Sequence, residues 1–360
     1  MSIQASVGIA QGEDSYTVGA NACQDAFDRL GTSDPSVVLV FSSVEYDQEK
    51  MLQGVRSVSK NALLVGCSTA GEITTAGPAK RHSVTVMALT SDAISFFAGI
   101  GENIARGATE AGKVAADSVK KQAQNGKLDA FIMLPDVLVG NGADIVRGAL
   151  QSLGSHFPIV GGAAGDDFEF KKTYQYLNDV VHSGAVIGLG LQGTFKMGIG
   201  VKHGWIPVGT PKKVTKSNGA VLHELGSEEM LIRDPITVDE KGSITCAAEI
   251  PEGSDIRLMI GSREEAVKVA KVAAENALAQ LDGGKPKAII IFNCIARNKL
   301  FGERSGEEID AIQEALGKDV PLIGFYTYGE QAPLGGEVRN IEKCNPAFHN
   351  ETVVIFVLGE

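Results

Sequence analysis

One short turn, present in three copies, constrains the fold of this 360-residue chain more than any other feature. In each copy an apolar run ends in a glycine, small residues follow, and a second glycine comes directly before an acid. The copies are LLVGCSTAGE at 63–72, PIVGGAAGDD at 158–167 and PLIGFYTYGE at 321–330. Because self-similarity along a chain marks repeat architecture, we expect the protein to be built from copies of one unit.

The sequences on both sides of each turn repeat as well. A β-rich run and an amphipathic helical pattern precede the turn, another β-rich run follows it, and a strand with a longer helix opens the unit. This order predicts a β-α-β-α-β-β unit over residues 4–92, 93–194 and 255–359. Strands joined by a crossover helix run parallel, and the closing pair is expected to be antiparallel. The predicted fold class is therefore α/β, with mixed parallel and antiparallel sheets covered by helices.

Residues 195–254 interrupt the repeat. The segment FKMGIGVKHG at 195–204 resembles SFFAGIGENI at 95–104, in the opening strand of the second unit. We interpret it as a degenerate opening that begins a second domain, and the Pro and Gly residues after it as a boundary loop. The prediction is two domains, 1–194 and 195–360.

Composition excludes several classes of protein. The formal net charge is −11 and no basic run is present, which argues against nucleic-acid binding. No signal-peptide pattern opens the chain, and no apolar run reaches the ~18 residues that a membrane-spanning helix needs. The five cysteines show no CxxC spacing, which favours a reducing compartment over a disulfide framework or zinc site. We expect a cytoplasmic protein that binds no metal.

The first turn raises the possibility of a nucleophile at Cys67. The equivalent residues of the other copies are Gly162 and Phe325, so the glycines and the acid are shared and the sulfur is not. A nucleophile elbow also requires GxSxG between a strand and a helix, whereas a strand is expected after this turn. We therefore predict that Cys67 is a buried small residue and that no residue of the chain is catalytic. A glycine-lined turn instead lets a ligand approach the backbone closely.

Several motifs, in the right order, resemble those of the FIST family (F-box and intracellular signal transduction). VGCSTAGEI with SVTVMAL, and PDVLVGNGADIVRGALQSLGSHFPIVGGAAGDDFEFKKT, are similar to the FIST N-terminal domain. GWIPVGTPKKVTKSNGAVLHEL, IPEGSDIRLMIG, FNCIARNKLFGE, IGFYTYGEQAP and FHNET are similar to the FIST C-terminal domain. The resemblance implies a stand-alone, prokaryotic-type sensory protein for intracellular signal transduction. It implies a small ligand, with amino acids among the proposed inputs, and no established catalysis.

Candidate ligand contacts follow from the turns and from residues near them. In the N-terminal domain they are Ser68, Thr69 and Glu72. In the C-terminal domain they are Arg297, Tyr326, Thr327, Tyr328, Glu330, His349 and Asn350. Arg297 directly follows a β-run, so its guanidinium is a candidate clamp for a carboxylate, and Glu330 is a candidate partner for an ammonium group. A cleft with both charges suits an amino acid or a similar zwitterion. The alternatives are a surface salt bridge for Arg297 and turn-closing bonds for Glu72, Glu330, His349 and Asn350.

Two other functions stay open at this point. Some stand-alone relatives resemble haem proteins that sense nitric oxide, and His203, beside the only tryptophan, Trp205, is the candidate axial ligand. An enzyme that uses acids and tyrosines for acid–base chemistry is the third possibility. No kinase, receiver or cyclase segment follows the last unit. We therefore expect the output to pass to a separate signalling protein, such as a kinase or a chemoreceptor.

Overall fold

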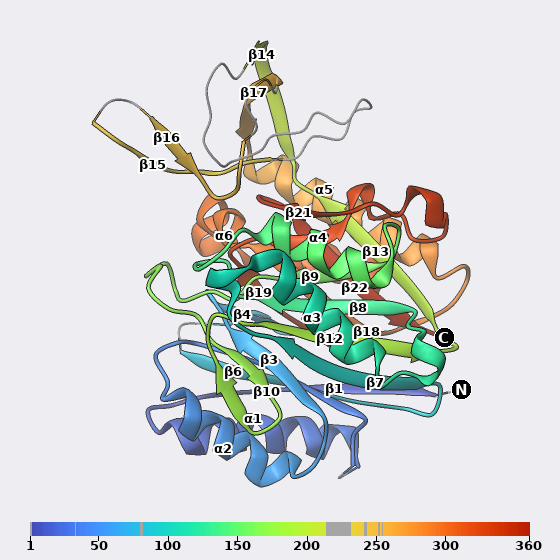
Figure 1. Ribbon diagram of the computed structural model, residues 1–360. Helices are drawn as coiled ribbons and strands as arrows, with labels where there is room; N and C mark the ends of the chain where they lie inside the picture. The colour runs from blue at the N-terminus through green and yellow to red at the C-terminus, as the bar shows by residue number, and fades with distance from the viewer. Residues whose placement is uncertain are drawn as a thin grey trace.

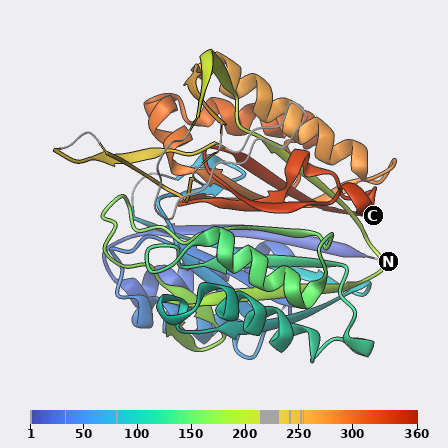
Figure 2. The same cartoon turned by 45° about the horizontal axis from the view of Figure 1, so that its top comes forward.

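Three sheets of six strands each form the body of the protein, which we describe from a computed structural model. The structure describes residues 2–32, 34–79, 82–213, 232–240, 243–250, 253 and 255–360. The inner faces of all three sheets share one apolar core, to which Leu39, Ile187 and Phe356 each contribute from a different sheet. Helices cover the outer faces in pairs (Figures 1 and 2). The predicted α/β class with mixed, helix-covered sheets is confirmed.

The repeated unit is present three times, as the sequence predicts. The first unit contains β1 (Ile3–Gln11), α1 (Ser15–Leu30), β2 (Val37–Ser42), α2 (Gln48–Ser59), β3 (Leu64–Ser68), β4 (Glu72–Thr74), β5 (Gly77–Pro78) and β6 (Ser83–Ser91). The second contains β7 (Ile94–Gly101), α3 (Ala108–Lys120), β8 (Ala130–Pro135), α4 (Gly142–Leu153), β9 (Ile159–Gly162), β10 (Gln175–Leu177), β11 (Val180–His182) and β12 (Val186–Gly193). The third contains β13 (Lys196–Lys202), α5 (Arg263–Gln280), β18 (Pro286–Cys294), α6 (Ile295–Phe301), α7 (Gly306–Leu316), β19 (Leu322–Thr327), β20 (Glu330–Pro333), β21 (Pro346–His349) and β22 (Val353–Gly359).

The opening strand of the third unit differs from the prediction. It is β13, which pairs with the closing strand β22 as β1 pairs with β6 and β7 with β12. The reason lies in the glycines of β13: a Cβ at Gly198 or Gly200 would lie 1.9 Å from the carbonyl oxygen of Ala277 or Ala273 in α5. Only a strand with glycines at these positions allows the helix to pack so closely.

The described residues between β13 and α5 (203–213, 232–240, 243–250, 253 and 255–261) form an insertion, which we call the arm. Here β14 (Trp205–Lys213) pairs with β17 (Asp255–Gly261), the strand expected to open the third unit. A second ribbon joins β15 (Pro235–Val238) to β16 (Ile244–Cys246). Both ribbons project from the body, the second beyond α6 and away from the chain termini (Figure 1). None of the helices that the structure describes is both long and apolar enough to cross a membrane.

The strand after each glycine turn leaves its own unit and joins a neighbouring sheet. β4 pairs with β19 of the third unit, β20 pairs with β9 of the second, and β10 pairs with β3 of the first. The closing strand is instead β6, β12 or β22, which is antiparallel to its neighbours. It does not pair with the strand before the glycine turn, as the predicted closing pair would, because β2, β8 or β18 lies between them. The predicted boundary at 194/195 falls between β12 and β13. Because β4 and β20 each cross that boundary, the two segments are interlocked through two of the three sheets.

Candidate functional site

The three glycine turns meet at one end of the molecule, at the carboxyl ends of the parallel strands. The N–H of Ala70 donates to the carbonyl of Tyr326 (3.0 Å), and the N–H of Ala163 donates to Gly329 (2.8 Å). The N–H of Gly165 donates to Ser68 (3.0 Å), which joins the second turn to the first. We call this region, residues 68–71, 163–166 and 326–329, the turn end. Ligands of open α/β sheets collect beyond the carboxyl ends of the strands, so the turn end is where a site is expected.

The exchanged strands begin with Glu72, Gln175 and Glu330. These residues pair with Phe325, Cys67 and Gly162, which occupy one equivalent position after the first glycine of each turn. The repeated turn pattern aligns Asp166 with the two glutamates, but in the structure Asp166 closes its turn by accepting N–H groups of residues 170–172. An amide, Gln175, occupies the position of the glutamates, because the turn of the second unit is extended by residues 166–172 before its strand begins.

The two buried glutamates are held in the same way. The carboxylate of Glu330 accepts bonds from the hydroxyl of Thr327, from the N–H of Thr352 (3.1 Å) and from its hydroxyl (2.7 Å). Glu72 accepts from Thr69 (2.5 Å) and from the hydroxyl of Ser83. Burial raises the pKa of each carboxyl to about 7, although these hydrogen bonds favour the charged form.

A residue one or two positions before the closing strand adopts the left-handed conformation in all three units. It is His82 (φ 57°), Gly184 (φ 69°) or Glu351 (φ 64°). This conformation costs energy for a residue with a side chain, so it is the fixed geometry of the repeat. The side chain at this position differs between units, and only in the third is it a carboxylate.

That carboxylate belongs to a pair of acids between the body and the arm. The carboxyl of Glu351 lies close enough to that of Asp234 in the arm for each to shift the pKa of the other. Burial, with the charges of Asp234 and Glu330, raises the pKa of Glu351 to about 8, and burial also raises the pKa of Asp234. Among the described residues, Oε2 of Glu351 and Oδ1 of Asn350 are buried acceptors without a hydrogen-bond partner. We call Asp234, Asn350 and Glu351 the acid-pair site.

A positive charge lies next to the acid-pair site. Lys299 of α6 places its Nζ 3.2 Å from the ring centroid of Phe168, and its charge stabilises the ionised form of Asp234. The site therefore combines buried acceptors for a cation with an ammonium group suited to an anion.

Arg297 does not take the predicted role of a free carboxylate clamp. Its guanidinium is fully buried and donates to the carboxylate of Glu308 and to the carbonyls of His203 (2.5 Å) and Ala266 (3.0 Å). These partners already accept the N–H groups of the guanidinium that a ligand carboxylate would need. The structure thus favours the alternative of an ion pair, but in the interior of the protein and not on its surface.

Several other predicted contacts serve the turns themselves. The hydroxyl of Ser68 donates to the carbonyl of Gly165 (2.8 Å), and the hydroxyl of Tyr328 donates to Asp166. His349 is buried with its Nε2 2.9 Å from the carbonyl of Ala332, and burial lowers its pKa to about 4. Tyr326 packs in the apolar cluster that lies between its sheet and helices α5 and α7. Of the predicted residues, Glu330, Thr327 and Asn350 are the ones that the structure brings next to the acid pair.

Comparison with known proteins assigns the chain to a family. The family model for the FIST N domain matches residues 36–228, more than half of the chain, and that for the FIST C domain matches residues 199–333. The chain belongs to the FIST family. FIST domains are associated with signal transduction and small-ligand sensing, as the sequence motifs imply.

Two curated proteins that are similar to this chain are named as uncharacterized proteins. One from Mycobacterium tuberculosis is 26% identical over 200 residues, which are 44% of this chain and 51% of the relative. One from Methanocaldococcus jannaschii is 31% identical over 199 residues, which are 52% of this chain and 38% of the relative. The matched region thus spans about half or less of these proteins.

The comparison with solved structures gives matches to two enzymes, both at low similarity. A cyanuric acid hydrolase from A. caulinodans matches with a TM-score of 0.44 and 8% identity, over 99% of both chains. A chorismatase matches with a TM-score of 0.41 and 8% identity, over all of both chains.

Haem, which some stand-alone relatives suggest, does not fit His203 as it is placed here. Nδ1 of His203 accepts a hydrogen bond from the N–H of Trp205 (2.9 Å), so the proton of the neutral ring lies on Nε2. A haem-ligating histidine needs the opposite tautomer, with Nδ1 donating and Nε2 free to bind iron. Among the described residues, no group of three or more His, Cys, Asp or Glu side chains is placed to hold a metal ion.

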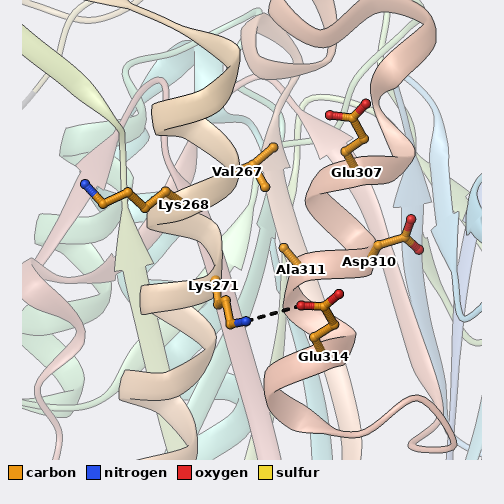
Figure 3. A pocket seen from close by; sticks show the side chains of 7 residues that line it. All are labelled: Val267, Lys268, Lys271, Glu307, Asp310, Ala311 and Glu314. Carbon is orange, nitrogen blue, oxygen red and sulfur yellow. Dashed lines mark hydrogen bonds and ion pairs between the residues drawn. The ribbon is translucent and has the colours of Figure 1, made fainter.

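A surface hollow of about 290 Å³ lies elsewhere, between α5 and α7. Figure 3 shows its lining, which carries both signs of charge and includes an ion pair between Lys271 and Glu314 (3.2 Å). The lining residues are Val267, Lys268, Lys271, Glu307, Asp310, Ala311 and Glu314. None of them belongs to the turn end, and we place no site there.

Sequence reasoning missed four residues that lie at or near the acid-pair site and the turn end: Asp234, Lys299, Glu351 and Gln175. A signal for Glu351 exists, because it lies within two residues of the start of a closing strand, as His82 and Gly184 do. Asp234 and Lys299 carry no such signal, since their place depends on how the arm and α6 pack on the body.

Proposed function

We propose that this FIST protein is a sensory protein that binds a small ligand with an ammonium group, an amino acid, at the acid-pair site. The observation that carries the proposal is the pair of buried acceptors, Oε2 of Glu351 and Oδ1 of Asn350, that lack a donor. A buried acceptor without a partner costs about 1–3 kcal/mol, and an ammonium group brings three donors. The second carboxylate, Asp234, supplies the balancing charge.

Lys299 supports the choice of a zwitterion over a simple amine. Its ammonium group lies close enough to act on Asp234, so a ligand held by the acid pair has its carboxylate within reach of this lysine. The proposed roles are Glu351, Asn350 and Asp234 for the ligand ammonium and Lys299 for the ligand carboxylate. Glu330 contributes a further buried negative charge behind Glu351.

Binding without turnover is the proposed activity. Two thiols lie near the acid pair. Burial together with the charges of Glu330 and Glu351 raises the pKa of Cys294 well above the ordinary value, and burial with the charge of Asp234 raises that of Cys246. A thiol in such surroundings stays protonated, whereas catalysis needs the thiolate. The arm contributes Asp234, so a bound ligand joins arm and body. We infer that this contact is what a separate signalling partner, such as a kinase or a chemoreceptor, detects.

The test is calorimetric titration of the full chain with a panel of amino acids and with matched amines that lack the carboxylate. Glu351→Gln should weaken binding of both classes, and Lys299→Gln should weaken the amino acids alone. A lost charged hydrogen bond of 1.5–3 kcal/mol corresponds to a weakening of about 10- to 150-fold.

Glu314→Gln and Lys271→Gln, from the hollow between α5 and α7, are matched controls that should leave binding unchanged. The proposal is wrong if no member of the panel binds. It is also wrong if the Glu351→Gln variant binds the panel with the same affinity as the Glu314→Gln control.

A further inference from the structure

The loop at residues 166–172, an extension that the other two turns lack, is held in a strained conformation over the turn end. Three of its residues with side chains adopt left-handed backbone angles: Asp167 (φ 53°), Phe168 (φ 68°) and Phe170 (φ 50°). The carboxylate of Asp166 fixes this shape by accepting the N–H groups of Phe170 (2.9 Å), Lys171 (2.6 Å) and Lys172 (2.9 Å). Strain of this kind persists where the surroundings hold it, and it collects at ligand contacts.

What the loop holds in place is a set of aromatic rings. Phe170 stacks on Tyr328, with ring centroids 4.8 Å apart and an interplanar angle of 20°. Phe168 meets Phe170 edge-on at 5.9 Å and lies 6.4 Å from Tyr328. We call Phe168, Phe170 and Tyr328 the aromatic platform. Phe170 remains 47% exposed, so its apolar surface is available to a further ring or chain.

Lys299 connects the aromatic platform to the acid-pair site. Its ammonium group lies over the ring of Phe168, while its charge acts on Asp234 of the acid pair. A ligand whose carboxylate bonds to Lys299 therefore has its other substituents beside Phe168. When the lysine turns toward that carboxylate, it also uncovers the ring face that it occupies in this structure.

We propose that the aromatic platform is the specificity subsite for the ligand side chain, and that it selects amino acids with an aromatic or large apolar side chain. This inference rests on the proposed binding of an amino acid at the acid-pair site. Apolar rings offer no hydrogen bond to a polar side chain but gain area and stacking with an aromatic one. The order of affinity is then phenylalanine, leucine, alanine.

The experiment compares the binding of phenylalanine, leucine and alanine to the full chain and to Phe170→Ala. Phenylalanine should bind the native chain at least tenfold more tightly than alanine, since a pocket discriminates by about 10- to 200-fold for each added methylene that it buries. Phe170→Ala should remove most of this preference, while its affinity for alanine should stay within about twofold of that of the native chain. Tyr16→Ala, at an aromatic residue of α1 that is 44% exposed, is the matched control and should change nothing.

The outcomes separate the two proposals. If the three amino acids bind the native chain equally and Glu351→Gln weakens them all, the aromatic platform is not a specificity subsite, while the acid-pair site stands. If Phe170→Ala weakens alanine as much as phenylalanine, the platform acts on the fold of the loop and the inference is overturned. If none of the three binds, the proposed function and the inference fail together. Phe170→Leu, which keeps an apolar side chain, should retain leucine binding and lose affinity for phenylalanine.

Discussion

Glu330 and Gln175 occupy equivalent positions in two units, and each accepts a hydrogen bond from the N–H that precedes its closing strand. The donor is Thr352 for Glu330 (3.1 Å) and Ala185 for Gln175 (3.4 Å). The amide of Gln175 also donates to Thr173 (3.2 Å), whereas Glu330 accepts from Thr327. The repeat itself thus shows that an amide fits where the other units hold a buried carboxyl. The acid is a feature added to the repeat and is not required by it.

Glu330→Gln should therefore fold and should alter the pH dependence of stability. Burial raises the pKa of Glu330 to about 7 from 4.5, so the folded state binds this proton more tightly than the unfolded state does. The stabilisation is complete below about pH 4.5 and is lost as the pH rises through 7, an effect of up to about 3 kcal/mol. Urea unfolding at pH 5, 6 and 7.5 should show that the free energy of unfolding of the variant depends less on pH than that of the native chain. If the stability of Glu330→Gln declined with pH as much as that of the native chain, Glu330 would not be the source of this pH dependence.

Gly200→Ala should destabilise the protein by about 3 kcal/mol, because the new Cβ would lie 1.9 Å from the carbonyl oxygen of Ala273. Gly306→Ala is the control, since the nearest atom to its added Cβ is 4.0 Å away. Thermal unfolding of both variants tests whether β13 is the strand on which α5 packs. Equal stability of the two variants would mean that α5 does not pack closely on β13.

Arg297→Met should be strongly destabilising, by about 3–5 kcal/mol, because it leaves the buried carboxylate of Glu308 without its charge partner. Removing both partners in Arg297→Met/Glu308→Met should recover much of this loss. A double-mutant cycle from denaturant unfolding measures the coupling. If Arg297→Met kept native stability but no longer bound ligand, that result would instead support the role of Arg297 as a carboxylate clamp, which the sequence suggests.

Cys67→Ala should lower stability by about 1 kcal/mol and leave ligand binding unchanged. Cys67 lies in the core that the three sheets share, and burial raises the pKa of its thiol well above the ordinary value. Alkylation of the folded protein at pH 7.5 should accordingly spare Cys67 and reach the half-buried Cys246 first. Loss of binding in a stable Cys67→Ala protein would show that the thiol itself contacts the ligand.

The repeat, the parallel strands and the mixed sheets could be predicted because they follow from local pattern. The strand exchange could not, since the three residues of β4 carry the same pattern whether they pair with β3 or with β19. The opening strand of the third unit was misassigned because β13 and β17 are both apolar. What separates them is the row of glycines in β13 that faces backbone carbonyls of α5, a tertiary contact.

The site was predicted in part for a similar reason. Glu330, Thr327 and Asn350 stand at ends of strands, where position along the chain indicates position in the sheet. Arg297 has the same kind of position, yet Glu308 of α7, eleven residues later, takes its guanidinium into the interior. Asp234 and Lys299 meet only because the arm and α6 pack at the same end of the body, and no local spacing encodes that packing.

Proton release on ligand binding tests the acid-pair site most directly. The pKa of Glu351 is raised to about 8, so at pH 7 the pair with Asp234 retains about one proton, which a bound ammonium group displaces. Calorimetric titration with phenylalanine at pH 7, in buffers of different ionisation enthalpy, counts the protons released. The account predicts release of a substantial fraction of one proton by the native chain, tighter binding as the pH rises toward 8.5, and no release from Glu351→Gln. Binding without proton release, or the same release from Glu351→Gln, would contradict it.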